Sequence, residues 1–160
     1  MLTPRDPRTV AWDEKRDTGV MSRENVDLIK RAYKAFAEGG FDAALQMLDP
    51  DIEWIPPKLA PTAGTYRGRA AAKTELRGFL EPFEDYRWES RDFIDAGDRV
   101  VVIGYQSGRG RISGVEVGQE QVHIWTVRDG RIIRMQMFDD RADAFEAAGL
   151  SEQDAHAGSS

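Results

Sequence analysis

The sequence contains no cysteine, few histidines and no long apolar run. The lack of cysteine excludes disulfide bonds, thiolate zinc sites, iron–sulfur clusters and cysteine nucleophiles from this chain. There are 2 histidines, and His156 lies in the C-terminal stretch, so one domain cannot assemble a two-histidine metal site and we expect no metal. Apolar runs such as 100–103 are far shorter than the ~20 residues that cross a bilayer, so we expect no membrane-spanning role.

Positive charge is also scarce. The 28 acidic and 22 basic residues give a net charge of -6, which is the wrong sign for a protein that binds nucleic acid. Arg109 and Arg111 come closest to a basic cluster, and we interpret them as solvated strand or loop positions, with an anion site as the alternative. Glycine-rich phosphate loops and the GxSxG nucleophile motif are missing as well, so we expect no cofactor.

The chain of 160 residues, 41% of them hydrophobic, has the composition of one globular domain. Residues 1–20 and 151–160 show no apolar periodicity and are predicted to be disordered tails around a domain of residues 21–150. The first 20 residues are charged and contain 2 prolines, which is unlike a signal peptide, so the expected location is cytoplasmic.

The first half of the domain is predicted to be largely helical. Apolar residues from position 22 onwards recur at spacings of three and four, with Ser22 as the cap, until Gly39 and Gly40 end the helix. A second helix ending near Leu48, a short strand over 51–55 and a third helix over 69–83 are expected to follow.

The second half is predicted to form strands over 86–94, 99–108, 115–128 and 131–139, joined by glycine-containing turns. Because tight turns join antiparallel neighbours, the sheet is expected to be antiparallel. A last helix over 142–148 is expected to be capped by Asp140 and ended by Gly149. This order predicts an α+β domain, with helices on one face of a curved antiparallel sheet that encloses a pocket.

Three stretches carry a resemblance to a known family: YKAFAEGGFDAALQMLDPDIEW at 33–54, YRGR at 66–69 and HIWTVRDGRIIRMQMFDDRADAFEAAGL at 123–150. They resemble the SnoaL-like branch of the NTF2-like superfamily, which includes ketosteroid isomerase, polyketide cyclases and limonene epoxide hydrolase. The resemblance covers about residues 21–150 and implies a cone-shaped fold with a central cavity.

The known catalytic sets of that superfamily are not matched in this chain. In a hand alignment, the isomerase's general base falls on Pro56, its oxyanion tyrosine on Ala32, next to Tyr33, and its oxyanion aspartate on His123. Proline cannot accept a proton, so the isomerase reaction is not expected in its known form. The epoxide hydrolase set fails too, because its positions fall near other residues, namely Gly104, Gln106, Glu53 and Ile55.

His123 is the best candidate for acid or base chemistry, because an imidazole ordinarily titrates near neutral pH. Asp139 is its candidate partner. Alternation along the last strand is expected to place Ile133, Met135, Met137 and Asp139 on the face that points into the cavity. The alternatives are that His123 is a half-buried strand residue bonded to backbone or water, and that Asp139 caps the last helix beside Asp140.

The remaining candidate site residues are expected to form the walls of the pocket. Alternation puts Gln121 and Trp125 on the same strand face as His123, and a ligand is expected between Trp54 and Trp125. The full set of candidate ligand-binding residues is Tyr33, Trp54, Gln121, Trp125, Met135 and Met137.

Three functions stay open from the sequence. The first is a cofactor-independent isomerase, cyclase or hydratase acting on a small apolar molecule with His123 as acid or base. The second is a non-catalytic protein that binds an apolar ligand, and the third is a dimerising scaffold module. A homodimer is expected in each case, because the strand face with Val122, Ile124 and Thr126 would otherwise meet water.

Overall fold

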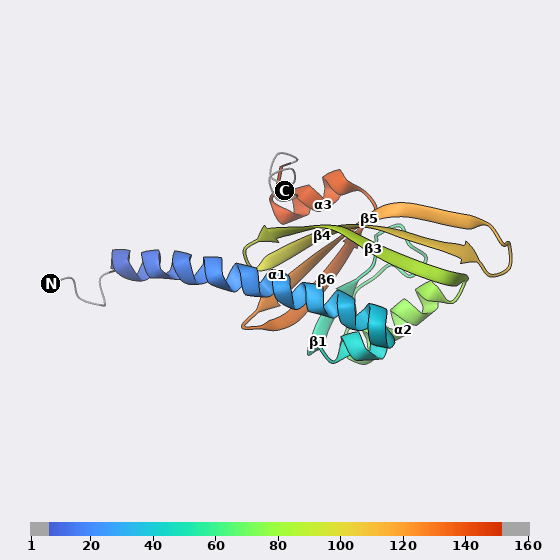
Figure 1. Ribbon diagram of the computed structural model, residues 1–160, viewed down its shortest axis with the longest axis horizontal. Coiled ribbons are helices and arrows are strands. Elements are labelled where there is room, and N and C mark those ends of the chain that lie inside the picture. The colour runs from blue at the N-terminus through green and yellow to red at the C-terminus, as the bar shows by residue number, and fades with distance from the viewer. Residues whose placement is uncertain (1–6, 152–160) are drawn as a thin grey trace.

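A computed structural model describes residues 7–151, with side chains from residue 22 onwards. In this part of the chain the elements are α1 (Pro7–Leu45), β1 (Leu48–Ile55), β2 (Tyr66–Arg67), α2 (Arg69–Leu80), β3 (Phe83–Ala96), β4 (Arg99–Gly110), β5 (Glu116–Arg128), β6 (Arg131–Phe138) and α3 (Arg141–Ala148). The strands form one sheet in the order β2-β1-β6-β5-β4-β3. The sheet is curved, and the long helix α1 crosses it with its N-terminal part projecting beyond it (Figure 1). The predicted α+β cone is thus confirmed.

The sheet is antiparallel except at one place. The tight turns between β3, β4, β5 and β6 give antiparallel pairs, as predicted. Strand β1, however, lies parallel to β6, with Trp54 beside Met135. A tight turn fixes the direction of the next strand, but β1 and β6 are separated by a helix and three long strands, so no local turn sets their relative direction.

Helix α1 begins at Pro7 rather than at Ser22, so residues 7–20, which were expected in a tail, are helical. A proline in the first turn costs a helix no hydrogen bond, and an established helix extends readily through ordinary helix-forming residues. Ser22 is therefore an interior helix residue, and its hydroxyl donates to the Gly97 carbonyl at 3.4 Å. Residues 1–6 and 152–160, the outer parts of the predicted tails, lie outside the described residues.

The predicted helix break at Gly40 and the predicted caps of the last helix agree with the structure. Gly40 interrupts α1 with φ 78° and ψ -174°, where only glycine is unstrained. The Asp140 carboxylate accepts hydrogen bonds from the first turn of α3, and Gly149 ends that helix in the left-handed conformation. The boundaries of β1 differ, because this strand already begins at Leu48 and includes Pro50. Its pairing with β6 shifts register between Leu48 and Glu53, and such an irregularity accommodates a proline.

The two faces of the sheet bury separate apolar clusters. The concave face packs against α1 and α2, with Ile29, Val102 and Val127 in its core. The other face packs against α3, where Phe145 joins Val122 and Ile124. The helices therefore cover both faces, not one, because the chain after β6 folds back over the outer side. This corrects the reason given for a homodimer: Val122 and Ile124 are covered within the chain, and the dimer stays a prediction without that support.

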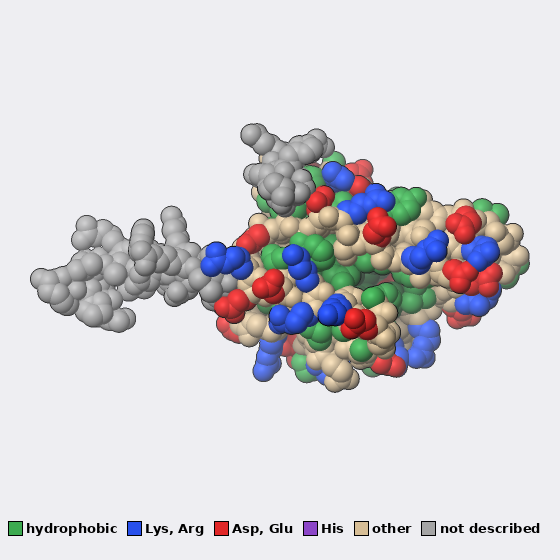
Figure 2. Space-filling view, in the orientation of Figure 1, with side chains coloured by type: hydrophobic (Ala, Val, Ile, Leu, Met, Phe, Trp, Pro, Cys, Tyr) green, Lys and Arg blue, Asp and Glu red, His purple; other side chains and the backbone are tan. Residues whose placement is uncertain are grey.

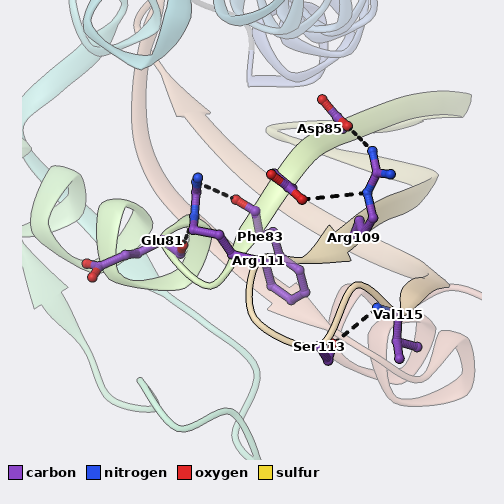
Figure 3. A network of polar contacts seen from close by, with 8 residues as sticks. Glu81, Phe83, Asp85, Arg109, Arg111, Ser113 and Val115 are labelled. Carbon is purple, nitrogen blue, oxygen red and sulfur yellow. Dashed lines mark hydrogen bonds and ion pairs between the residues drawn. The ribbon is translucent and has the colours of Figure 1, made fainter.

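The end of β4 and the loop after it are held at the start of β3 by Arg109 and Arg111, the two arginines singled out in the sequence (Figure 3). Arg111 donates to the carbonyl oxygens of Glu81 at 3.1 Å and Phe83 at 2.8 Å. Arg109 forms an ion pair with Asp85. The partners of these two guanidinium groups are a carboxylate and backbone carbonyls of the same chain. Arg109 and Arg111 therefore have a structural role and do not form an anion site.

Candidate functional site

A cavity of about 90 Å³ lies between the concave face of the sheet and helices α1 and α2. Its wall is mainly aromatic and aliphatic, and it is formed by Ala32, Tyr33, Phe36, Phe41, Ala44, Leu48, Trp54, Pro56, Pro57, Thr62, Glu75, Leu76, Phe79, Tyr86, Trp88, Gln106, Gln121, His123, Trp125, Met135 and Met137. Figure 2 shows hydrophobic side chains gathered around a hollow in the middle of one face, with charged side chains around them. The geometry is that of a site for a small organic molecule.

Seven of the eight residues singled out in the sequence line this cavity, and Asp139 is the exception. Asp139 is exposed at the end of β6, and Asp140 rather than Asp139 caps α3. The expected inward face of β6 is also wrong at one position. Ile132, not Ile133, is buried in the concave core, because the register of β5 against β6 shifts there and inserts one extra residue.

Trp54 and Trp125 touch each other. Their ring centroids are 6.2 Å apart at an interplanar angle of 73°, which is an edge-to-face contact. A ligand therefore does not fit between these two rings as they stand, and the open volume lies beside them.

A chain of hydrogen bonds runs from Trp125 to His123. The Trp125 indole N–H donates to the Tyr33 hydroxyl oxygen at 2.8 Å. The Tyr33 oxygen lies 2.6 Å from Nδ1 of His123. An indole N–H can only donate, so the Tyr33 oxygen accepts from Trp125. The Tyr33 hydroxyl in turn donates its own hydrogen bond to Nδ1 of His123. Burial raises the pKa of Tyr33 well above its ordinary value, so this hydroxyl keeps its proton.

The chain continues from His123 to Asp139 through Gln121. Nε2 of His123 lies 2.8 Å from Oε1 of Gln121, and the Gln121 amide nitrogen donates to Oδ1 of Asp139 at 3.2 Å. Gln119 donates to the same carboxylate oxygen at 2.8 Å. His123 and Asp139 do not touch, and Gln121 links them by hydrogen bonds.

The histidine is held in its neutral form. Burial lowers the pKa of His123 from 6.5 to about 3, because the imidazolium ion would lose its hydration. The neutral tautomer with its proton on Nε2 accepts from Tyr33 and donates to Gln121, so both ring nitrogens are satisfied. The expectation that His123 titrates near neutral pH is wrong, because the sequence pattern did not show how completely the ring is enclosed.

A buried carboxylate forms a second polar position in the wall. Glu75 of α2 is only 4% exposed. The Trp54 indole N–H donates to its Oε1 at 2.6 Å, and the Thr62 hydroxyl donates to its Oε2 at 2.7 Å. The carboxylate is thus fixed by two donors from different segments, β1 and the loop after it.

Sequence reasoning missed Glu75, although a signal was present. Ala72, Leu76 and Phe79 form the apolar stripe of α2, and Glu75 lies three residues after Ala72 and four before Phe79. A charged residue on an apolar stripe faces the core, and that placement marks it as a candidate functional group.

Tyr86, Trp88 and Gln106 were also missed as cavity residues. The Tyr86 hydroxyl donates to Oε1 of Gln106 at 2.9 Å. Burial raises the pKa of Tyr86, so this hydroxyl stays protonated. Inward alternation on β3 and β4 was the available signal for these residues.

Among the described residues, no three His, Asp or Glu side chains lie close enough together to hold a metal ion. Within residues 7–151, no helix is both long enough and apolar enough to cross a membrane.

The chain is similar to several known proteins. An uncharacterised protein of Mycobacterium tuberculosis is 28% identical over 125 residues, which cover 71% of this chain and 87% of that protein. An NTF2-like protein of Burkholderia thailandensis is 27% identical, with a TM-score of 0.68 over 77% of this chain and 95% of the other. TerC, co-crystallised with polyporic acid, is 30% identical, with a TM-score of 0.65 over 78% of this chain and 98% of TerC. Residues 29–135 match the SnoaL-like domain, and the chain belongs to that family.

Proposed function

We propose that this chain binds a small, largely apolar organic molecule in the cavity of its cone. The observation that carries the proposal is the cavity of about 90 Å³, walled by aromatic and aliphatic side chains with polar groups fixed at a few positions. The co-crystallisation of the related TerC with polyporic acid supports the uptake of an organic molecule. An apolar cavity of ~150 Å³ accepts benzene, and the present volume is smaller, so compact molecules of about four to six non-hydrogen atoms are suitable first probes.

The proposal is tested by titrating the protein with isobutanol and cyclopentanone while nitrogen-15 NMR follows the indole N–H signals of Trp54 and Trp125. Both signals should shift in a saturable way. The blocking variant is Ala44→Leu, because Ala44 lines the cavity, and its matched control is Ala147→Leu on the exposed side of α3. Binding that survives Ala44→Leu would contradict the proposal, and a failure of all small compounds to bind would favour the scaffold function instead.

Proton transfer on the bound molecule, in an isomerase-, cyclase- or hydratase-type reaction, is the second candidate function. The link from His123 through Gln121 to Asp139 favours it, because it ties the cavity to a carboxylate. Both ring nitrogens of His123 have partners and burial lowers its pKa to about 3, so His123 can take a proton from the bound molecule only where Tyr33 gives up its hydrogen bond to Nδ1.

The measurement for this second function is hydrogen–deuterium exchange at the carbon next to the carbonyl of cyclopentanone in heavy water. His123→Gln should slow a catalysed exchange by ~100-fold or more, the usual scale for a positioned acid or base. An exchange rate equal to that of buffer would exclude catalysis on this ketone and leave binding as the function.

A further inference from the structure

The Glu75 carboxylate has hydrogen-bonding capacity left over. Trp54 and Thr62 each donate one hydrogen bond to it, one to each oxygen. An ionised carboxylate has about four lone-pair positions, so each oxygen can accept once more. Because Glu75 lines the cavity, a bound molecule can reach that remaining capacity.

Within the part of the chain that the structure describes, no Lys or Arg lines the cavity beside this carboxylate. Among the described residues that line the cavity, Glu75 is the only Asp, Glu, Lys or Arg. Of the three cations of α2, Lys73 forms an ion pair with Asp42 at 2.5 Å and Arg69 donates to the Leu48 carbonyl. The third, Arg77, is exposed and does not line this cavity. A buried carboxylate without a cation is costly, so a positive group brought by a ligand would be favoured there.

The rings around the carboxylate act in the same direction. The Trp54 ring, whose N–H is bonded to Glu75, packs against Phe41 with centroids 5.6 Å apart and against Trp125 with centroids 6.2 Å apart. Aromatic faces carry partial negative charge and attract cations. The fixed electrostatics of this end of the cavity therefore favour a cation over a neutral molecule and oppose an anion.

We propose that the cavity selects a small organic ammonium ion, with Glu75 as the group that pairs with its nitrogen and the aromatic wall as the surface for its apolar part. This inference rests on the proposed function, because it names the class of the molecule that the cavity binds. It adds a specificity-determining residue that the sequence pattern did not single out.

Glu75 also has a structural role, because it ties α2 to β1 and to the loop that carries Thr62. Glutamine can keep that role: its amide oxygen accepts from Trp54, and its amide nitrogen can donate to the Thr62 hydroxyl. Glu75→Gln therefore removes the charge and preserves the tie. The matched control is Glu24→Gln, which removes a charge from an exposed position of α1 outside the cavity.

The experiment compares isobutylamine, isobutanol and isobutyrate at neutral pH, with affinity measured from the Trp54 indole N–H signal. These molecules share an apolar body and differ in charge. In the wild type, the amine should bind about tenfold or more tightly than the alcohol, the scale of a charge-assisted hydrogen bond, and isobutyrate should bind most weakly. Glu75→Gln should abolish the preference for the amine, and Glu24→Gln should keep it.

The outcomes separate this inference from the proposed function. Equal affinities for amine and alcohol in the wild type would overturn the inference and leave the proposed function intact. A preference for the amine that persists in Glu75→Gln would also overturn it. If none of the three compounds shifts the Trp54 signal, the proposed function and the inference fall together. If Glu75→Gln does not fold, the affinities of the three compounds for the wild type still test whether the cavity prefers the ammonium ion.

Discussion

Trp88 lies flat against His123, with ring centroids 4.2 Å apart and planes inclined by 12°. The indole covers one face of the imidazole, while Tyr33 and Gln121 take its two nitrogens. Protonation would place a second proton on Nδ1, where Tyr33 already donates. The histidine that the sequence nominated as an acid or base is therefore built into the wall as a neutral group.

The first prediction concerns the titration of His123. Its ring signals in NMR should stay those of a neutral imidazole from pH 8 down to about pH 4, because its pKa is lowered to about 3. The reference is a His123-containing peptide, which should titrate near pH 6.5. A midpoint for the folded protein above about pH 6 would contradict the enclosed, neutral histidine.

The same shift makes stability depend on pH. In the unfolded chain His123 binds a proton below about pH 6.5, whereas in the folded protein it does so only near pH 3. The unfolded state therefore binds more protons between these values, and the free energy of unfolding should fall as the pH falls through this window. Comparison with His123→Gln isolates the effect: the wild type should lose stability more steeply on acidification, by up to a few kcal/mol. Parallel profiles would contradict this prediction.

The second prediction tests the packing of Trp88 through a glycine. A Cβ atom at Gly104 would lie 2.3 Å from the Trp88 ring and 2.7 Å from the Glu89 carbonyl oxygen. Gly104→Ala should therefore lower the free energy of unfolding by about 1–3 kcal/mol and disturb the contact of Trp88 with His123.

Gly78→Ala is the matched control for that substitution. Nothing lies within 4 Å of a Cβ at Gly78, in α2, so alanine there should raise stability by up to ~1 kcal/mol. Thermal or urea unfolding measures both variants. An unchanged Gly104→Ala variant would show that the Trp88 ring moves without cost.

The third prediction concerns the hydrogen bond from Trp54 to Glu75. Trp54→Phe keeps an aromatic ring but removes the N–H donor, so it should cost about 1.5–3 kcal/mol, the range for a bond to a charged group, in addition to any loss of packing. In a Glu75→Gln background the same substitution should cost less, because the acceptor is then neutral. A double-mutant cycle measures this coupling, and a coupling energy of zero would contradict the prediction.

The fourth prediction concerns the cover of the outer sheet face. Phe145 is 3% exposed and packs with the apolar residues of β4 and β5 on that face. Phe145→Ala should lower the free energy of unfolding by about 3–5 kcal/mol. Phe79→Ala, on the cavity side where Phe79 is half-buried, should cost less.

Sedimentation of the wild type tests the predicted homodimer separately, and a monomer mass at all concentrations would contradict it.

Features that depend on short stretches of sequence were predictable. The inward face of β5, with Gln121, His123 and Trp125, follows from the two-residue repeat of a strand. The break at Gly40 and the caps of α3 at Asp140 and Gly149 follow from local backbone and side-chain chemistry. Local patterns predicted the α+β class, and the SnoaL-like family was recognised from the resemblance of the stretches at 33–54, 66–69 and 123–150.

The tertiary structure decided the features that join distant residues. The direction of β1 beside β6, the placement of α3 on the outer face and the extra residue at Ile133 depend on how separate segments pack, which no local pattern specifies. The chemistry of the site is of the same kind. The hydrogen bond between Trp54 and Glu75 joins residues that are 21 positions apart in the sequence, and the one between Tyr33 and His123 joins residues that are 90 positions apart. The sequence by itself determined which ionisable groups the chain contains, but their charge depends on burial and on partners, and only the folded packing supplies these.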